Sequence, residues 1–191
     1  MNIFVLDLDH TLCARYHHDK HLVKMQLESA QMLCTVCDFY GQTTPYRPTH
    51  KYHPCTEWVG HSLQNWIWLR DLAYALEEEW RFRYDKPYIT HKSVDVIRSL
   101  SIPQHIPDIG LTPFAQAMPD KYKNPNPVIA YRNYYIGEKL SYKKKNGVFV
   151  MNSWKGSGMP TWVSIPLLKY FDSGNKDDLL NTGMEQQYAN V

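Results

Sequence analysis

The sequence predicts a mostly α, compact, helical single domain with a short N-terminal strand and long, Pro-rich, ordered loops. Apolar residues recur at helical spacing in two long stretches, 17–38 and 57–84. Nine of the twelve prolines lie in 42–56 and 102–127, and so much proline excludes a long helix there. With 43% hydrophobic residues, a chain of this length can bury a real core.

Each element follows from its local pattern. The apolar run 3–6 predicts a short strand, followed by a turn at 9–11. Helices are expected over 17–38, which ends near Gly41, and over 57–84. Interspersed Ile, Leu and Phe favour an ordered loop over a linker at 102–127. The remaining expected segments are a short helix at 93–100, a helix at 128–142, a basic turn at 143–147, an apolar stretch at 148–151 and a Gly/Ser loop. We expect one domain over 1–171 and a polar, mobile tail over 172–191.

Composition bounds the class of protein. No apolar run approaches the roughly 20 residues of a membrane span, so we expect no membrane partner. The run 3–6 is followed at once by Asp7 and Asp9, unlike a signal peptide. Four cysteines do not form a disulfide framework in a chain of this size, and a cytoplasmic protein is the expectation. The body is more basic than the tail, which is compatible with a polyanionic partner.

One stripe of the 17–38 helix carries titratable side chains. At about 100° per residue, two imidazoles, an amine and a carboxylate share a face, which favours proton transfer or metal binding. Its members are His17, His21, Lys24, Glu28, Gln31 and Thr35, opposite Leu22, Val23, Leu27, Ala30 and Leu33. The alternative is the solvated face of an amphipathic helix. The flanking Met25 and Met32 favour a functional site.

Aromatic and positive side chains also alternate later in the chain. This interleaving is typical of surfaces that stack bases and contact phosphates. The candidate nucleic-acid or nucleotide-binding residues are His50, Lys51, His53, Arg132, Tyr135, Lys139 and Lys143. The alternative, which is favoured for any single residue, is a helix with a buried Tyr stripe and a solvated lysine turn.

Two motifs suggest a metal-dependent hydrolase instead. The apolar run followed by Asp7-x-Asp9-x-Thr11 resembles the opening motif of haloacid dehalogenase-type phosphatases, which implies a nucleophilic and an acid/base Asp around Mg²⁺. The i, i+4 pair His17 and His21 is an alternative set of metal ligands, completed by loop histidines. Cys34 and Cys37 lack a second pair at matching spacing, which favours buried cysteines over zinc ligands.

A second resemblance covers most of the chain. His21-Leu22 is followed at Glu28 by a carboxylate seven residues after the His. Further matching motifs are Gly60-His61, Glu78-Glu79, Arg83-Tyr84, Glu138-Lys139 and Pro160-Thr161-Trp162. In these features the chain resembles the bacteriophage endonuclease V-type pyrimidine-dimer DNA glycosylases. It also resembles a group of phage proteins with Asp-Lys-His and His-Pro-Cys-Thr motifs.

The glycosylase resemblance implies a helical domain that binds duplex DNA, flips a nucleotide and cleaves the glycosidic bond. It also implies that the chain's own α-amine, on Met1, attacks the sugar to form an imine, with Glu28 as catalytic carboxylate and His21 beside it. Lys24 is the alternative amine. Leu27 and Gln31 stand where that family has arginines, and Asn2 disfavours removal of Met1.

The sequence therefore favours a phage-type enzyme that cleaves N-glycosidic bonds in DNA or nucleotides in the cytoplasm of an infected host. We expect no cofactor, and no metal in this mechanism. Two alternatives stay open. One is a metal-dependent phosphatase or hydrolase that uses His17 and His21, or Asp7 and Asp9. The other is a non-catalytic phage protein that binds a nucleotide or a host protein.

Overall fold

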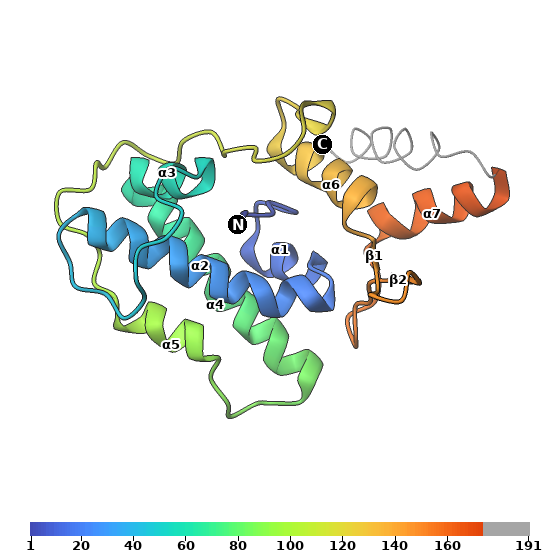
Figure 1. Ribbon diagram of the computed structural model, residues 1–191, viewed down its shortest axis with the longest axis horizontal. Helices are drawn as coiled ribbons and strands as arrows, with labels where there is room; N and C mark the ends of the chain where they lie inside the picture. Colours follow the sequence, from blue (N-terminus) through green and yellow to red (C-terminus); the bar gives the residue numbers. More distant parts are fainter. Residues whose placement is uncertain (174–191) are drawn as a thin grey trace.

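A computed structural model describes residues 1–173 and confirms the mostly helical, compact class (Figure 1). The prediction for the tail falls almost entirely outside these residues. The described helices are α1 (His10–Tyr16), α2 (Asp19–Phe39), α3 (Pro54–His61), α4 (Leu63–Tyr84), α5 (Lys92–Ser99), α6 (Pro127–Glu138) and α7 (Thr161–Ser173), with a 3₁₀ turn, η1, at Asp120–Tyr122.

The beginning of the chain differs from the prediction. Residues 3–6 are buried, but they form no strand in the part of the chain that the structure describes, and the Leu6 N–H donates to the Phe4 carbonyl within them. Asp9 caps α1 by accepting from the Leu12 N–H at 2.8 Å, so a helix replaces the expected turn. His17 ends α1, and His18 caps α2 by accepting from the His21 N–H. The predicted single helix over 17–38 is therefore wrong at its first turn.

The core forms where α2 and α4 pack together, with α1, α3 and α5 around them. Ser62 interrupts the predicted 57–84 helix, because its hydroxyl caps α4 by accepting from the Gln64 N–H. Asp85, in the left-handed conformation, ends α4. The buried side chains of α4 include Trp66, Leu69, Leu72, Ala73 and Leu76.

A buried guanidinium joins the first helices to α4. The side chain of Arg83 is fully buried and forms ion pairs with Asp19 at 2.9 Å and Glu79 at 2.7 Å. It also donates to the carbonyls of Arg15 and His17. Because these carbonyls lie at the C-terminal end of α1, Arg83 fixes the break between α1 and α2 against α4.

The Pro-rich segment is an ordered loop, as predicted. Ile106 is buried, and Phe114 stacks on Trp58 with ring centroids 4.8 Å apart. The side chain of Asn65 donates to the Thr112 hydroxyl at 2.7 Å and fastens this loop to α4. The loop thus covers the same side of the core as α3.

The C-terminal part departs from the predicted 128–142 helix. After α6, strands β1 (Ser141–Lys143) and β2 (Phe149–Met151) form an antiparallel hairpin that pairs Ser141 with Met151 and Lys143 with Phe149. In Figure 1 the hairpin extends away from the main helices, beside α6 and α7.

Candidate functional site

The α-amine of Met1 lies beside the carboxylate of Glu28. The distance between Met1 N and Glu28 Oε2 is 3.8 Å, and the same oxygen accepts from the Asn2 N–H at 2.9 Å. The other oxygen, Oε1, lies 3.2 Å from Lys24 Nζ. The Glu28 side chain is 10% exposed, so a largely buried carboxylate faces two amines.

Met1 presents its amine while its side chain is buried. That side chain is 2% exposed, whereas the residue as a whole is half-buried. The accessible surface of Met1 therefore belongs to its main chain. The Thr56 hydroxyl, on α3, contacts Met1 Sδ at 3.7 Å. Together these contacts hold the amine at the surface edge of the site.

Asn2 anchors the start of the chain. Its side-chain amide donates to the Ala117 carbonyl at 2.9 Å, and its Oδ1 accepts from the Ile3 N–H at 2.8 Å. The Tyr131 hydroxyl, from α6, lies 3.0 Å from the same Oδ1. Asn2 therefore connects the N-terminal segment to the Pro-rich loop and to α6, and fixes the direction of Met1.

His53, which caps α3, and Cys55, in the first turn of α3, both interact electrostatically with the α-amine of Met1. Burial lowers the pKa of His53, and the positively charged N-terminus and His50 lower it further, against the opposing effect of Glu28. Burial raises the pKa of the Cys55 thiol to about 11. His53 is a predicted site residue that the structure brings near Met1 and Glu28, whereas His50 is exposed.

Three histidines form a separate, buried cluster. The rings of His18 and His21 have centroids 4.0 Å apart, and His21 stacks on Phe4 at 4.5 Å. His17 Nδ1 lies 2.7 Å from the Cys13 carbonyl oxygen. Burial lowers the pKa of His17 to about 4 and of His18 to about 3, and it lowers that of His21 still more strongly. These imidazoles are neutral in the folded protein at neutral pH.

The predicted stripe is therefore divided. Glu28 and Lys24 lie at the Met1 amine, but His17 belongs to the end of α1, and its placement on one helix face with them is wrong. Lys24 is largely exposed, with 63% of its side-chain surface accessible. Two residues expected on the apolar face, Val23 and Leu27, are exposed.

The predicted nucleic-acid-binding residues lie in different environments. Tyr135 is completely buried, so the prediction that it contacts a nucleic acid is wrong. Arg132 is half-buried and forms an ion pair with Asp7 at 3.0 Å. Lys51 is exposed and pairs with Asp38. Lys139 is half-buried, its amine over the Tyr134 ring, while Lys143 is exposed in the hairpin.

The aspartates and cysteines that were considered as metal ligands have other roles or environments. Asp7 pairs with Arg132, and Asp9 caps α1. Cys34 and Cys37 are buried and free. Within residues 1–173, no group of three or more His, Cys, Asp and Glu side chains is placed to hold a metal ion.

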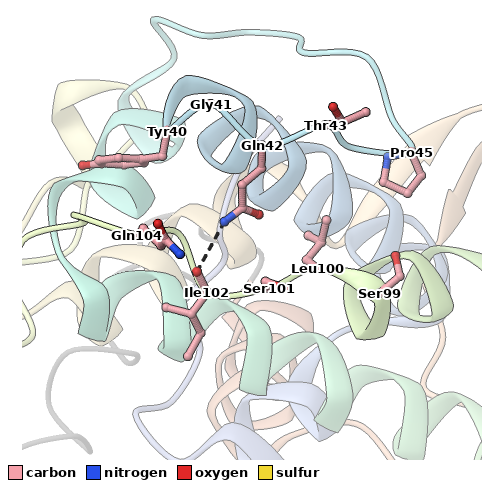
Figure 2. A pocket seen from close by; sticks show the side chains of 10 residues that line it. All are labelled: Tyr40, Gly41, Gln42, Thr43, Pro45, Ser99, Leu100, Ser101, Ile102 and Gln104. Atoms are coloured by element: carbon pink, nitrogen blue, oxygen red, sulfur yellow. Dashed lines mark hydrogen bonds between the residues drawn. The ribbon is translucent and has the colours of Figure 1, made fainter.

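A hollow of about 540 Å³ between α2 and α3 adjoins the N-terminus through Thr56. Lys51 lines it, together with Phe39 and Tyr52, whose side chains are exposed. Another hollow, of about 570 Å³, is lined by residues 40–45 and 99–104, where the Gln42 amide donates to the Ile102 carbonyl (Figure 2). It includes no predicted site residue, and Tyr40 is its one titratable side chain.

Sequence reasoning missed Asn2, Thr56 and Cys55 as neighbours of the amine. They come from the N-terminal segment and from α3, and no periodicity links them. The Pro54 start of α3 was a usable signal, since proline is frequent in the first turn of a helix and places Cys55 and Thr56 there too.

Comparison with protein-family models, with curated proteins and with solved structures finds no significant match for the chain. Among the described helices, none has both the length and the apolar character to span a membrane. The chemistry of this site must therefore be argued from its geometry. A primary amine beside a largely buried carboxylate can attack an electrophilic carbon and have the resulting positive charge stabilised.

Proposed function

We propose that the protein cleaves N-glycosidic bonds in DNA by imine chemistry at the α-amine of Met1, with Glu28 as the catalytic carboxylate. The observation that carries the proposal is the contact between Met1 N and Glu28 Oε2, supported by the hydrogen bond from the Asn2 N–H to the same oxygen. The α-amine of Met1 is a primary amine, which is the kind of nucleophile that forms an imine with a sugar carbon.

The reaction replaces the glycosidic bond of the sugar by a bond to the α-nitrogen of Met1. The neutral amine attacks C1′ of the sugar, a nitrogen–carbon bond forms, and the glycosidic bond breaks. The base leaves with the electron pair and takes up a proton. One N–H proton of the amine then passes to the ring oxygen as the bond between C1′ and that oxygen breaks, which opens the sugar ring and leaves a positively charged imine on Met1. Glu28 is close enough to stabilise this charge, and its burial strengthens the effect by limiting solvent screening.

Features around the amine fit a nucleotide substrate. Phe39 and Tyr52 are exposed aromatic side chains at the hollow between α2 and α3, where bases can stack. Lys51 lines the same hollow and can contact a phosphate. Thr56 connects this hollow to Met1. These contacts support DNA as the substrate.

Lys24 is the second candidate nucleophile, because its amine lies 3.2 Å from the other oxygen of Glu28. Its exposure argues against it, because solvent screens the interaction of an exposed amine with Glu28.

Borohydride reduction in the presence of a duplex that contains an abasic site tests the proposal. The intact protein should give a covalent adduct. Glu28→Gln should lower the trapping rate by roughly 100-fold or more, while Glu78→Gln, at an exposed carboxylate of α4, should leave it unchanged. A protein acetylated at its α-amine should not be trapped. Absence of an adduct with the unmodified protein would reject imine chemistry, and binding without turnover would favour a nucleotide- or protein-binding role.

A further inference from the structure

The hairpin of β1 and β2 presents an exposed face that mixes positive and apolar side chains. Lys143 pairs across the strands with Phe149, and Ser141 with Met151. All four are exposed, and Phe149 keeps 69% of its surface accessible. The intervening Tyr142 and Val150 are half-buried, so alternation along each strand separates an outer face from an inner one.

The charge of this region has one sign. Residues 139–160 hold five lysines and no Asp or Glu. Lys143, Lys144 and Lys145 follow one another into the turn and are all exposed. A projecting segment with this composition complements a polyanion.

The hairpin is fastened to the start of α2, the helix that carries Glu28. The Ser153 carbonyl accepts from the Asp19 N–H at 2.8 Å, and the Asn152 amide lies 3.4 Å from Nε2 of His18, the residue that caps α2. The Lys20 amine lies over the Tyr142 ring. The hairpin therefore has a fixed base on the first turn of α2.

From this base, a basic edge continues along α2 toward the amine. Lys20 and Lys24 are exposed one turn apart, and Lys24 contacts Glu28. Eight helical steps separate Lys20 from Glu28 and span about 12 Å, which is about four steps of a DNA duplex at 3.4 Å each. A duplex on the hairpin thus reaches the site within a few base pairs.

We propose that the outer face of the hairpin, with Lys143–Lys145 and Phe149, docks duplex DNA and aligns it along α2 toward Met1. The choice of DNA as the polyanion rests on the proposed function. A two-stranded ribbon fits the width of a major groove, and the lysines at its tip can reach phosphates. Continuity with the basic edge of α2 favours DNA over an anionic lipid surface, which would need the hairpin alone.

The test measures binding of a fluorescently labelled, undamaged duplex by anisotropy as salt rises. Replacing Lys143, Lys144 and Lys145 by Gln in the full chain should lower the slope of log Kd against log salt by about 2.7, at about 0.9 per phosphate contact. Between roughly 50 and 200 mM salt, the Kd of the unmodified protein should then rise about 40-fold more than that of the variant. Phe149→Ala should weaken binding with little change in slope.

A matched control replaces Lys121 and Lys123 by Gln. Both lysines are exposed, but their charges are paired with Glu138 and Asp120. This variant should keep the salt slope of the unmodified protein. An unchanged slope in the hairpin variant would overturn the inference. Binding to vesicles that contain anionic lipid, with no binding to duplex, would also overturn it.

The two proposals fail separately. If the protein is trapped as an imine but the hairpin variant keeps the salt slope of the unmodified protein, the proposed function is retained and the docking face is rejected. Hairpin-dependent duplex binding without any trapped adduct would reject the imine chemistry and support the docking face.

Discussion

Acidification should destabilise this protein well before its carboxylates titrate, because His17, His18 and His21 are buried and neutral. Their pKa values in the folded state lie at about 4, about 3 and far below the ordinary value, whereas the unfolded chain binds protons near pH 6.5. Stability is therefore complete above about pH 6.5 and falls as the pH drops toward the folded-state values.

The magnitude follows from proton linkage. For one histidine, lowering the pH from about 7.5 to about 5.5 costs about 1.3 kcal/mol when the folded state takes up no proton. Three such histidines cost about 4 kcal/mol, a large share of the 5–15 kcal/mol that stabilises an ordinary domain. The positive charges of Arg83, Lys20, Lys24 and Lys139 oppose protonation of the cluster, whereas Asp19 favours it at His18.

Urea unfolding at several pH values measures this loss directly. His18→Asn keeps a side-chain acceptor for the α2 cap but cannot titrate, so about 1.3 kcal/mol of the pH-dependent loss should disappear. His61→Gln, at an exposed position of α3, should leave the loss unchanged. A free energy of unfolding that stays constant between about pH 7.5 and 5.5 would refute the reasoning.

Three further predictions concern packing and the anchor of the N-terminus. Arg83→Met should destabilise the protein by about 3–5 kcal/mol in urea unfolding, since it leaves Asp19 and Glu79 without their buried partner; a loss under about 1 kcal/mol would show that the pairs contribute as little as surface ones. Gly137→Ala should lower the free energy of unfolding by about 1–3 kcal/mol, because the added methyl would overlap the side chain of the buried Tyr122. A raised melting temperature would contradict this. Asn2→Leu should lower the free energy of unfolding by about 1–3 kcal/mol, because it leaves the Ile3 N–H unpaired. It should also slow imine trapping. Trapping at an unchanged rate would show that Asn2 does not orient the amine.

Local patterns predicted the elements that depend on local interactions. The helical periodicity of 57–84 and the proline content of 102–127 are properties of neighbouring residues. Most of 57–84 is helical as expected, although Ser62 divides it between α3 and α4, and an ordered loop formed in 102–127. The N-terminal region was different. Asp9 and His18 cap two successive helices within ten residues, and a periodicity window long enough to detect α2 spans that break. The assignment of His17 to one face of the 17–38 helix was therefore wrong.

The site depends on contacts that no local pattern contains. Glu28 is buried while Leu27 is exposed, because the N-terminal segment covers one side of α2 and brings Asn2 N to the carboxylate. Tyr135 was predicted to face a ligand, but its partners Phe4 and His18 lie more than 100 residues away in the chain. The pairing of Met1 with Glu28 was expected from the glycosylase resemblance and not from spacing.

Mass spectrometric mapping of the borohydride-reduced adduct tests the central claim most directly. After reduction with a duplex that contains an abasic site, proteolysis should yield a single modified peptide, with the added sugar on the α-nitrogen of Met1. If the sugar is found on Lys24 instead, the nucleophile is the Lys24 amine, which contacts the other carboxylate oxygen of Glu28. An unmodified protein under conditions in which it binds the duplex would contradict the proposed chemistry.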